Sequence, residues 1–450
     1  PRTYCLRNSC SATELRRHNL IGILTYNTIS FNDGSLKIEE NRGQLMDWQK
    51  FDTESGAPLW FLSLPNAKNT SIGVLTNIGS RDEKWPKEAG LAHALEHMFF
   101  QGSTVSLKTQ RAIAAYTENV GGISNAFTDD EETLYFHKID TSEIARAVKV
   151  LGESLFYPRF PKNVIPAQMK VVLQEMADRN DFPDAYLLES WTKKRMARHP
   201  LSQITIGLKE AVENFKQEDF FRFAKKYYHP KNFTYIAVGS VDPLKLVGLI
   251  TNQFPTDVLE GNKHKRQPCA LPDKPAEKLV LYKEIEQAHI VFASIFPAIT
   301  EKETCALNLF QVMISGGMSF PFFLEIREKH CFCYSVYSHI QQRSDTTFFG
   351  IGMTTLPSNY EKAIDLALKI IAEEKENEKL LKRSKTLIKG NYSLDDNTMS
   401  ILIKAARRIS IHGVPLSFEE NVKRYEEVTI DEIADVVNKY LKPENFYTGV

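Results

Sequence analysis

The sequence predicts an α+β protein of two tandem homologous domains, each with a mostly antiparallel or mixed sheet packed against helices. Three observations predict this class. A segment of the chain recurs 213 positions later (Lys226 to Lys439), the 450 residues are about three times the ~150 of one domain, and strand-like and helix-like runs alternate irregularly. A repeat this long indicates whole domains, because solenoid units span only ~20–50 residues.

The repeated segment has the pattern of a helix, a proline turn and a strand. It reads Lys-Tyr-Tyr-His-Pro-Lys-Asn-Phe at 226–233 and Lys-Tyr-Leu-Lys-Pro-Glu-Asn-Phe at 439–446. The proline interrupts each helix, and the β-rich run 234–238 follows the first copy. Apolar positions upstream also correspond: Phe215, Phe220 and Phe223 match Val428, Ile433 and Val436.

Further elements follow from local patterns. Runs rich in β-branched and aromatic residues predict strands at 59–64, 71–78, 278–282 and 290–296, and apolar spacing predicts helices at 109–119 and 360–373. Residues 255–275 are polar and rich in proline, which favours a linker between the two halves. Residues 1–44 have no counterpart in the second half and are interpreted as an N-terminal extension.

Composition excludes several classes of protein. Lys+Arg and Asp+Glu both number 56, so the chain lacks the basic excess of a general nucleic-acid binder, and no nucleic-acid partner is predicted. No apolar run reaches the ~18 residues of a membrane span. The six cysteines lack the spacing of a disulfide scaffold or a zinc ribbon. The sequence does not indicate a compartment.

The stretch 90–100 carries the chemistry. It is apolar almost all round, as in a buried helix, yet it holds His93, Glu96 and His97. His93 and His97 are four residues apart, so a helix places both rings on one face, where one metal ion can bridge them. The order His-x-x-Glu-His is the inverzincin signature of zinc peptidases. Two core histidines held by hydrogen bonds are the alternative, but burying three such groups without a partner is costly.

A catalytic zinc usually takes three protein ligands and leaves a position for water. Glu175, after the apolar run 171–173 on a predicted helix, is a candidate for the third ligand. On its own pattern, Glu175 is more often a solvated helix acid.

Two segments carry a resemblance to a known family. The run 79–83 (Gly-Ser-Arg-Asp-Glu) and the run 90–103, containing Gly-Leu-Ala-His-x-x-Glu-His-Met-x-Phe-x-Gly-Ser, resemble the pitrilysin family of zinc metallopeptidases, which includes insulysin and the mitochondrial processing peptidase. This family has its third ligand roughly 75 to 80 residues after the second histidine, which matches Glu175. The family often has a further acid seven positions upstream, where this chain has Gln168.

The resemblance also implies substrate-binding residues. The run 121–136 reads as a β-hairpin, and in the family its first strand is the edge that pairs with substrate, which implies that Gly122, Asn125 and Ala126 contact substrate backbone. In the second half, Arg327 and Tyr334 match an arginine and a tyrosine that reach the substrate carbonyl. The alternatives are an ordinary hairpin and a surface arginine, and three residues near Tyr334 depart from the family pattern: His330, Cys331 and Cys333.

The resemblance covers the chain from about 45 to 450 and implies its organisation. We expect an extension at 1–44, a catalytic zinc-binding peptidase domain at 45–256, a linker at 257–275, and an inactive homologous domain at 276–450 that contributes the Arg/Tyr pair. The second half has lost the metal residues, because at an offset of 214 the four motif positions hold Leu307, Phe310, Gln311 and Lys389. The family fold implies that the two domains enclose a chamber.

The predicted function is therefore that of a zinc-dependent endopeptidase with one Zn²⁺ per chain, acting on peptides or unfolded polypeptide segments with Glu96 as general base. Family members of this length form dimers, so a homodimer or a heterodimer with a related chain is expected. Two alternatives remain: a noncatalytic subunit of a two-chain processing peptidase, and a metal site that is structural or serves another hydrolase reaction. The remaining histidines of interest are expected to have core or surface roles: His137, His199, His229 and His412.

Overall fold

The computed structural model of the protein describes residues 47–254 and 262–450, so the extension predicted at 1–44 and part of the predicted linker lie outside the described residues. The first sheet has six strands in the order β1-β2-β6-β3-β5-β4, with β2 and β6 parallel and the other neighbours antiparallel. Its strands are β1 (Trp48–Asp52), β2 (Pro58–Ser63), β3 (Asn69–Thr76), β4 (Ile123–Thr128), β5 (Thr133–Asp140) and β6 (Phe233–Gly239).

The second sheet has four antiparallel strands in the order β10-β7-β9-β8. Its strands are β7 (Ala288–Pro297), β8 (Cys333–Gln342), β9 (Thr346–Thr355) and β10 (Phe446–Gly449). The predicted strand at 278–282 is wrong: Leu279 forms only an isolated bridge with Gly449 beside β10. The fold class predicted from the sequence is confirmed, with a mixed sheet in one domain and an antiparallel sheet in the other.

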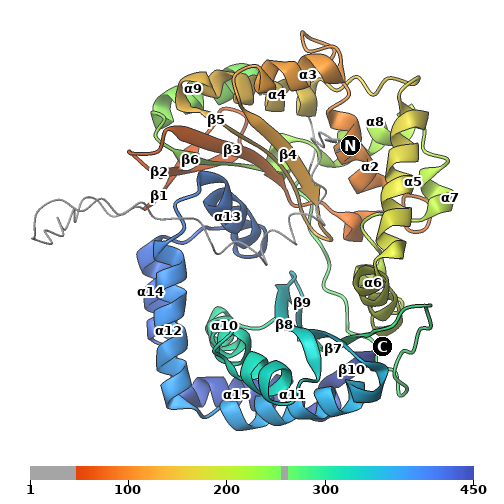
Figure 1. Cartoon of the computed structure of the whole chain (residues 1–450). Coiled ribbons are helices and arrows are strands. Elements are labelled where there is room, and N and C mark those ends of the chain that lie inside the picture. The colour runs from red at the N-terminus through yellow and green to blue at the C-terminus, as the bar shows by residue number, and fades with distance from the viewer. Residues whose placement is uncertain (1–46, 255–261) are drawn as a thin grey trace, which may run out of the picture.

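Helices cover the sheets (Figure 1). The first half contributes α2 (Leu91–Phe99), α3 (Gln110–Glu118), α4 (Ile144–Phe156), α5 (Ile165–Asp181), α6 (Pro183–Arg195), α7 (Lys209–Val212), α8 (Gln217–Tyr227) and α9 (Pro243–Gln253). The second half contributes α10 (Glu301–Ser315), α11 (Tyr360–Glu374), α12 (Glu378–Ser393), α13 (Thr398–His412), α14 (Phe418–Glu426) and α15 (Ile430–Tyr440). A π-helical segment, η5 (Phe322–Lys329), joins α10 to β8.

The sequence repeat corresponds to a structural repeat. In the first copy, α8 is followed by a 3-10 turn at Pro230–Asn232 and by β6; in the second, α15 is followed by a 3-10 turn at Pro443–Asn445 and by β10. Both α8 and α15 begin after a residue whose backbone N–H is capped by an acid at the third helical position, Asp219 and Glu432 respectively. The two halves are therefore copies of one α+β unit.

Each half lends one helix to the other half's sheet. α13 lies under the first sheet and buries Leu402, Ala406 and Ile409 against apolar residues of its strands. α6 lies on the second sheet, where the indole N–H of Trp191 donates to the backbone oxygen of Tyr447 at 3.0 Å. Full burial of one Leu or Ile side chain contributes ~1.5–3 kcal/mol to the free energy of unfolding, so the packing of α13 and α6 on the opposite sheets holds the two halves together strongly.

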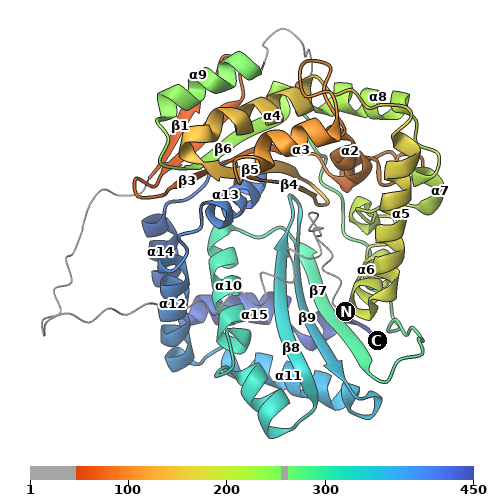
Figure 2. The same ribbon diagram turned by 45° about the horizontal axis from the view of Figure 1, so that its top comes forward.

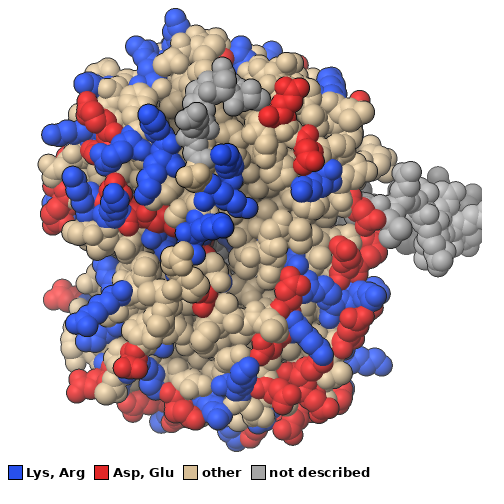
Figure 3. Space-filling model, turned by 180° about the vertical axis from the view of Figure 1, so that it is seen from behind, with Lys and Arg blue, Asp and Glu red and all other residues tan. Residues whose placement is uncertain are grey.

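The main core lies between α2, α4, α8, α9 and the face of the first sheet opposite α13. Within the described residues, no helix combines the length and the apolar content that crossing a membrane requires. The face seen in Figure 3 carries basic and acidic side chains in both its upper and lower halves rather than one continuous basic surface.

Candidate metal centre

The start of α2 is held by a glycine and a buried carboxylate. Gly90 precedes the helix with φ +90°, and a Cβ there would approach the backbone oxygen of Ile206 to 2.7 Å. Glu83 accepts hydrogen bonds from the backbone N–H groups of Gly90 (2.9 Å) and Ala92 (2.8 Å), which are free donors at a helix N-terminus. The run 79–83 thus positions the helix that carries the histidines.

Three of the predicted residues meet. His93 and His97 lie one turn apart on α2, with ring centroids 4.8 Å apart. Glu175 reaches them from α5, and its Oε2 lies 3.5 Å from His93 Nε2 and 3.8 Å from His97 Nε2. One donor atom from each residue lies within 4.8 Å of the others, the only such group of three or more His, Cys, Asp or Glu residues in the described parts of the chain.

The environment of these side chains suits a zinc ion. Burial lowers the pKa of both His93 and His97 to about 4, so both imidazoles are neutral at pH 7 and offer a lone pair. Burial raises the pKa of Glu175, and the electrostatic interactions of its carboxylate with His97 and with the Arg179 guanidinium oppose this rise. Within the described residues, the buried Nδ1 of His93 has no hydrogen-bond partner. Two neutral nitrogens and one carboxylate oxygen are donor types that catalytic zinc sites with an open position use, so these residues fit a zinc ion.

Glu96 lies beside this group on α2. Its Oε2 accepts a hydrogen bond of 2.5 Å from the hydroxyl of Thr128, the last residue of β4. Burial raises the pKa of Glu96 to about 7, and the Thr128 hydrogen bond acts in the opposite direction. The carboxylate is thus held in one orientation by a neutral donor.

The predicted substrate-binding residues lie at the edge of the first sheet. β4 is the last strand of this sheet, and among the described residues it pairs only with β5, with Asn125 opposite Phe136 and Ala126 opposite Tyr135. Ala126 is buried, and Gly122 precedes the strand where a Cβ would come 2.6 Å from Thr117 Cγ2. β4 also packs against α2, so this edge runs beside the three clustered residues.

Arg327 and Tyr334 do not join this group. Arg327 stands in η5 with its guanidinium over the rings of Phe323 (4.5 Å) and Tyr334 (4.8 Å). Tyr334 is 76% exposed at a β-bulge at the start of β8. η5 packs on α11, which both Figure 1 and Figure 2 place at the opposite end of the molecule from α2. One chain therefore does not bring this pair to its own His93 and His97.

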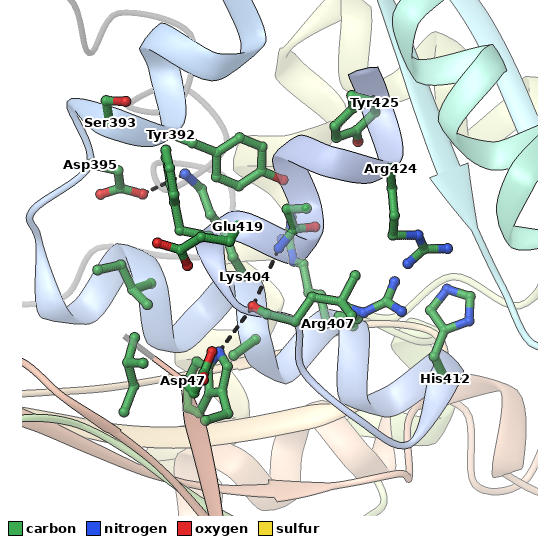
Figure 4. Close-up of a pocket in the computed structure, with 18 of the residues that line it drawn as sticks. Asp47, Tyr392, Ser393, Asp395, Lys404, Arg407, His412, Glu419, Arg424 and Tyr425 are labelled. Atoms are coloured by element: carbon green, nitrogen blue, oxygen red, sulfur yellow. Dashed lines mark hydrogen bonds and ion pairs between the residues drawn. The ribbon is translucent and has the colours of Figure 1, made fainter. Parts of the chain in front are cut away.

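A cavity of about 1210 Å³ lies between the domains, away from the predicted site residues. It is bounded by residues 62–67 and by α10, α13 and α14. In Figure 4, Arg424 and His412 point toward one corner, where Glu301 accepts hydrogen bonds from Arg408 (2.7 Å) and Arg424 (2.5 Å). The lining carries charges of both signs, and the cations of this corner are paired with Glu301.

Two functional positions were missed by sequence reasoning. Glu83 belongs to a motif that the resemblance had used, and its seven-residue distance from Gly90 could have suggested a helix cap. Thr128 belongs to the predicted hairpin, but no sequence signal pairs it with Glu96, since the contact joins residues 32 positions apart. The other predicted histidines lie elsewhere, with His137, His199 and His229 buried in the core and His412 in the cavity.

Family models match both halves of the chain. One described as Insulinase (Peptidase family M16) covers residues 61–208, and one described as Peptidase M16 inactive domain covers residues 214–388. The chain belongs to peptidase family M16. This is the pitrilysin family, so the resemblance seen in the residues is confirmed.

Several proteases are similar to this chain along most of their length. An uncharacterized zinc protease of Mycobacterium leprae is 26% identical over 386 residues, which is 84% of this chain and 86% of that protein. The uncharacterized zinc protease YmxG of Bacillus subtilis is 26% identical over 395 residues, or 86% of this chain and 93% of the relative. A solved protease from Helicobacter pylori shares the fold with a TM-score of 0.81 at 21% identity, covering 90% of this chain and 99% of that one.

Proposed function

We propose that this M16 protein is a zinc-dependent endopeptidase that hydrolyses peptides or unfolded polypeptide segments. The observation that carries the proposal is the convergence of His93, His97 and Glu175 beside the buried carboxylate of Glu96. The relatives are named as zinc proteases, which supports the proposal.

His93, His97 and Glu175 would hold one zinc ion per chain. Zinc in such a site supplies Lewis acidity toward water and toward a peptide carbonyl. The protein's part is to present neutral imidazoles and to leave an opening, and the side chains of His93, His97 and Glu175 are 12%, 22% and 20% exposed.

Glu96 acts as the general base. Its carboxylate takes a proton from the attacking water and then delivers it to the leaving amine, for which a pKa of about 7 is well matched near neutral pH. Thr128 leaves the other carboxylate oxygen of Glu96 free for this transfer, because its hydroxyl occupies only Oε2.

The substrate binds as an added strand on β4. The outer edge of β4 offers backbone N–H and C=O groups, so main-chain hydrogen bonds supply affinity with little dependence on substrate side chains. The N–H of Ala126 donates to the side-chain oxygen of Asn125 at 2.8 Å, and a substrate strand would take the place of that side chain. Such a site favours extended, unfolded segments over folded proteins.

Arg327 and Tyr334 act from a second chain. Both belong to a surface at the far end of the second sheet, and Tyr334 projects outward there. A homodimer, or a heterodimer with a related chain, would let this pair donate hydrogen bonds to the substrate oxyanion at the partner's site. Loss of such a donor typically costs ~10² to 10³ in rate.

In this proposal, residues 45–256 form the catalytic domain and residues 257–275 form a linker. Residues 276–450 form a noncatalytic domain that supports the first. The second half supports this division, since Leu307 and Phe310, at the positions that correspond to His93 and Glu96, are core residues of α10. A chamber enclosed by the domains would restrict substrates by size.

The test combines zinc analysis with cleavage of a pool of quenched fluorescent peptides by the parent and by Glu96→Gln. We expect stoichiometric zinc in both proteins and cleavage only by the parent. Absence of zinc from the parent would refute the proposal. A noncatalytic subunit is the second candidate, favoured by the separation of Arg327 from His93; it predicts zinc binding without cleavage until a related partner chain is added.

A further inference from the structure

Two hairpin turns, one from each domain, meet beside the candidate metal centre. The β4–β5 turn consists of four consecutive acids, 129–132 (Asp-Asp-Glu-Glu). The β8–β9 turn of the second domain, 343–345 (Arg-Ser-Asp), lies against it. Four adjacent carboxylates repel one another, so this turn needs cations and donors from outside to hold its shape.

The β8–β9 turn supplies them. Arg343 donates from Nε to Asp130 at 2.9 Å and from Nη2 to the same carboxylate, and its Nη2 lies 3.6 Å from Asp129. Ser344 donates to Glu131 from both its backbone N–H and its hydroxyl, each at 2.8 Å. The side chains of Arg343 and Glu131 are only 11% and 9% exposed, so solvent screens these contacts weakly.

Arg81 of the first domain closes the network. Its guanidinium binds Glu131 at 2.5 Å and both oxygens of Asp345 at 2.8 and 2.5 Å. Its backbone N–H donates to the backbone oxygen of Asp130 at 2.9 Å. The acidic turn is therefore fixed by contacts to both its side chains and its backbone. The second domain provides the contacts from Arg343 and Ser344.

Thr128 connects this turn to the chemistry. It is the residue immediately before Asp129, it is buried, and its hydroxyl donates to Glu96 Oε2 at 2.5 Å. The backbone of Asp129 donates to the oxygen of Glu132 at 2.8 Å, so a shift of the acidic turn moves the end of β4 and the Thr128 hydroxyl with it.

We propose that the β8–β9 turn of the second domain positions Glu96 for proton transfer, acting through the acidic turn 129–132 and Thr128. This inference rests on the proposed peptidase function, in which Glu96 is the base. It gives the second domain a part in the reaction within the same chain. Thr128 and Arg343 are positioning residues, since Thr128 touches only the base and Arg343 acts through the turn.

The test measures kcat and KM for the parent, Thr128→Ser, Thr128→Val, Arg343→Gln and the Thr128→Val/Arg343→Gln double variant. Outer contacts of this kind are worth about 10- to 100-fold, so Thr128→Val should lower kcat by that factor with KM within about threefold of the parent. Thr128→Ser keeps the hydroxyl and should retain kcat within about threefold. Arg343→Gln should lower kcat about tenfold but have little further effect in the Thr128→Val background.

Arg408→Gln is the matched control, because Arg408 also pairs with a carboxylate, Glu301, but within the second domain. Hydrogen–deuterium exchange adds a readout that needs no activity: Arg343→Gln should speed exchange at 123–133, with or without zinc, and Arg408→Gln should not. Full kcat in Thr128→Val, or multiplying effects in the double variant, would overturn the inference while leaving the peptidase function intact. An inactive parent would overturn both.

Discussion

Gly207→Ala tests the close contact between the backbone at Gly207 and the backbone at Ala89 and Gly90, which lies just before α2. Gly207 has φ +88°, and a Cβ there would lie 2.3 Å from the backbone oxygen of Ala89 and 2.4 Å from the Cα of Gly90. Neither neighbour is a flexible side chain, so the backbone must move by close to 1 Å to restore a normal contact. Because Gly90 precedes the first residue of α2, that movement displaces the helix of His93 and His97.

The expected magnitude has two parts. A left-handed conformation costs an L-residue ~1–2 kcal/mol, and forcing extra atoms into a packed region typically costs ~1–3 kcal/mol. Gly207→Ala should therefore lower the free energy of unfolding by ~2–5 kcal/mol. Gly56→Ala is the matched control: Gly56 has φ +81° with nothing within 4 Å of its Cβ position, so only the first part applies, ~1–2 kcal/mol.

The assay is urea unfolding of the full chain at pH 7, followed by tryptophan fluorescence, together with the zinc content after dialysis. Gly207→Ala should lose more stability than Gly56→Ala and should also retain less zinc. Equal stability losses in the two variants would refute the close approach of Gly207 and Gly90. If Gly207→Ala is less stable than Gly56→Ala but retains all of its zinc, the contact between Gly207 and Gly90 does not position the metal centre.

Three further outcomes are expected. Glu153 is buried and accepts four hydrogen bonds from residues 103–107, which lower its pKa to about 2, so Glu153→Gln should cost ~1–3 kcal/mol at pH 7, and the difference should shrink as pH falls from about 4.5 toward 2 in urea unfolding. Chelation should remove zinc and abolish peptide cleavage, added Zn²⁺ should restore both, and His97→Ala should bind less than a tenth of the zinc by elemental analysis. Equal mixing of inactive Glu96→Gln and Arg327→Ala chains should recover about a quarter of parent activity if Arg327 acts from a second copy, and none if it acts within its own chain.

The parts of the fold that could be predicted are those set by local pattern. Two histidines four residues apart on an apolar run predict a helix with both rings on one face, and α2 has that arrangement. The repeat between 226–233 and 439–446 predicts like units because each copy carries the same helix stop and the same strand start. Glu175 needed the family resemblance, since a lone acid on a helix has no distinguishing pattern.

The parts that could not be predicted depend on contacts between distant residues. The run 278–282 has the composition of a strand, but its backbone hydrogen bonds to Thr448 and Val450 make a single bridge, between Leu279 and Gly449 at the end of the four-residue strand β10. The hydrogen bond between Thr128 and Glu96 and the meeting of the acidic turn with Arg343 join residues 32 and 213 positions apart. No periodicity reports on such pairs.

The exchange of α6 and α13 gives a physical reason for keeping a second domain without metal residues. α6 and α13 correspond in the repeat, since Pro183 plus 213 falls within two residues of the start of α13. Each helix covers the sheet of the other half. Removing the second half would therefore expose the apolar residues of the first sheet that contact Leu402, and it would leave Trp191 of α6 without the residues of the second sheet on which it packs. Hydrophobic burial therefore opposes loss of the second half even though Leu307 and Gln311 stand where the first half has His93 and His97. Arg343 of the second domain also opposes this loss, because it pairs with the acidic turn of the first domain. The first domain thus depends on the second for one face of its sheet and for the turn beside Glu96, which is why the two halves act as one unit.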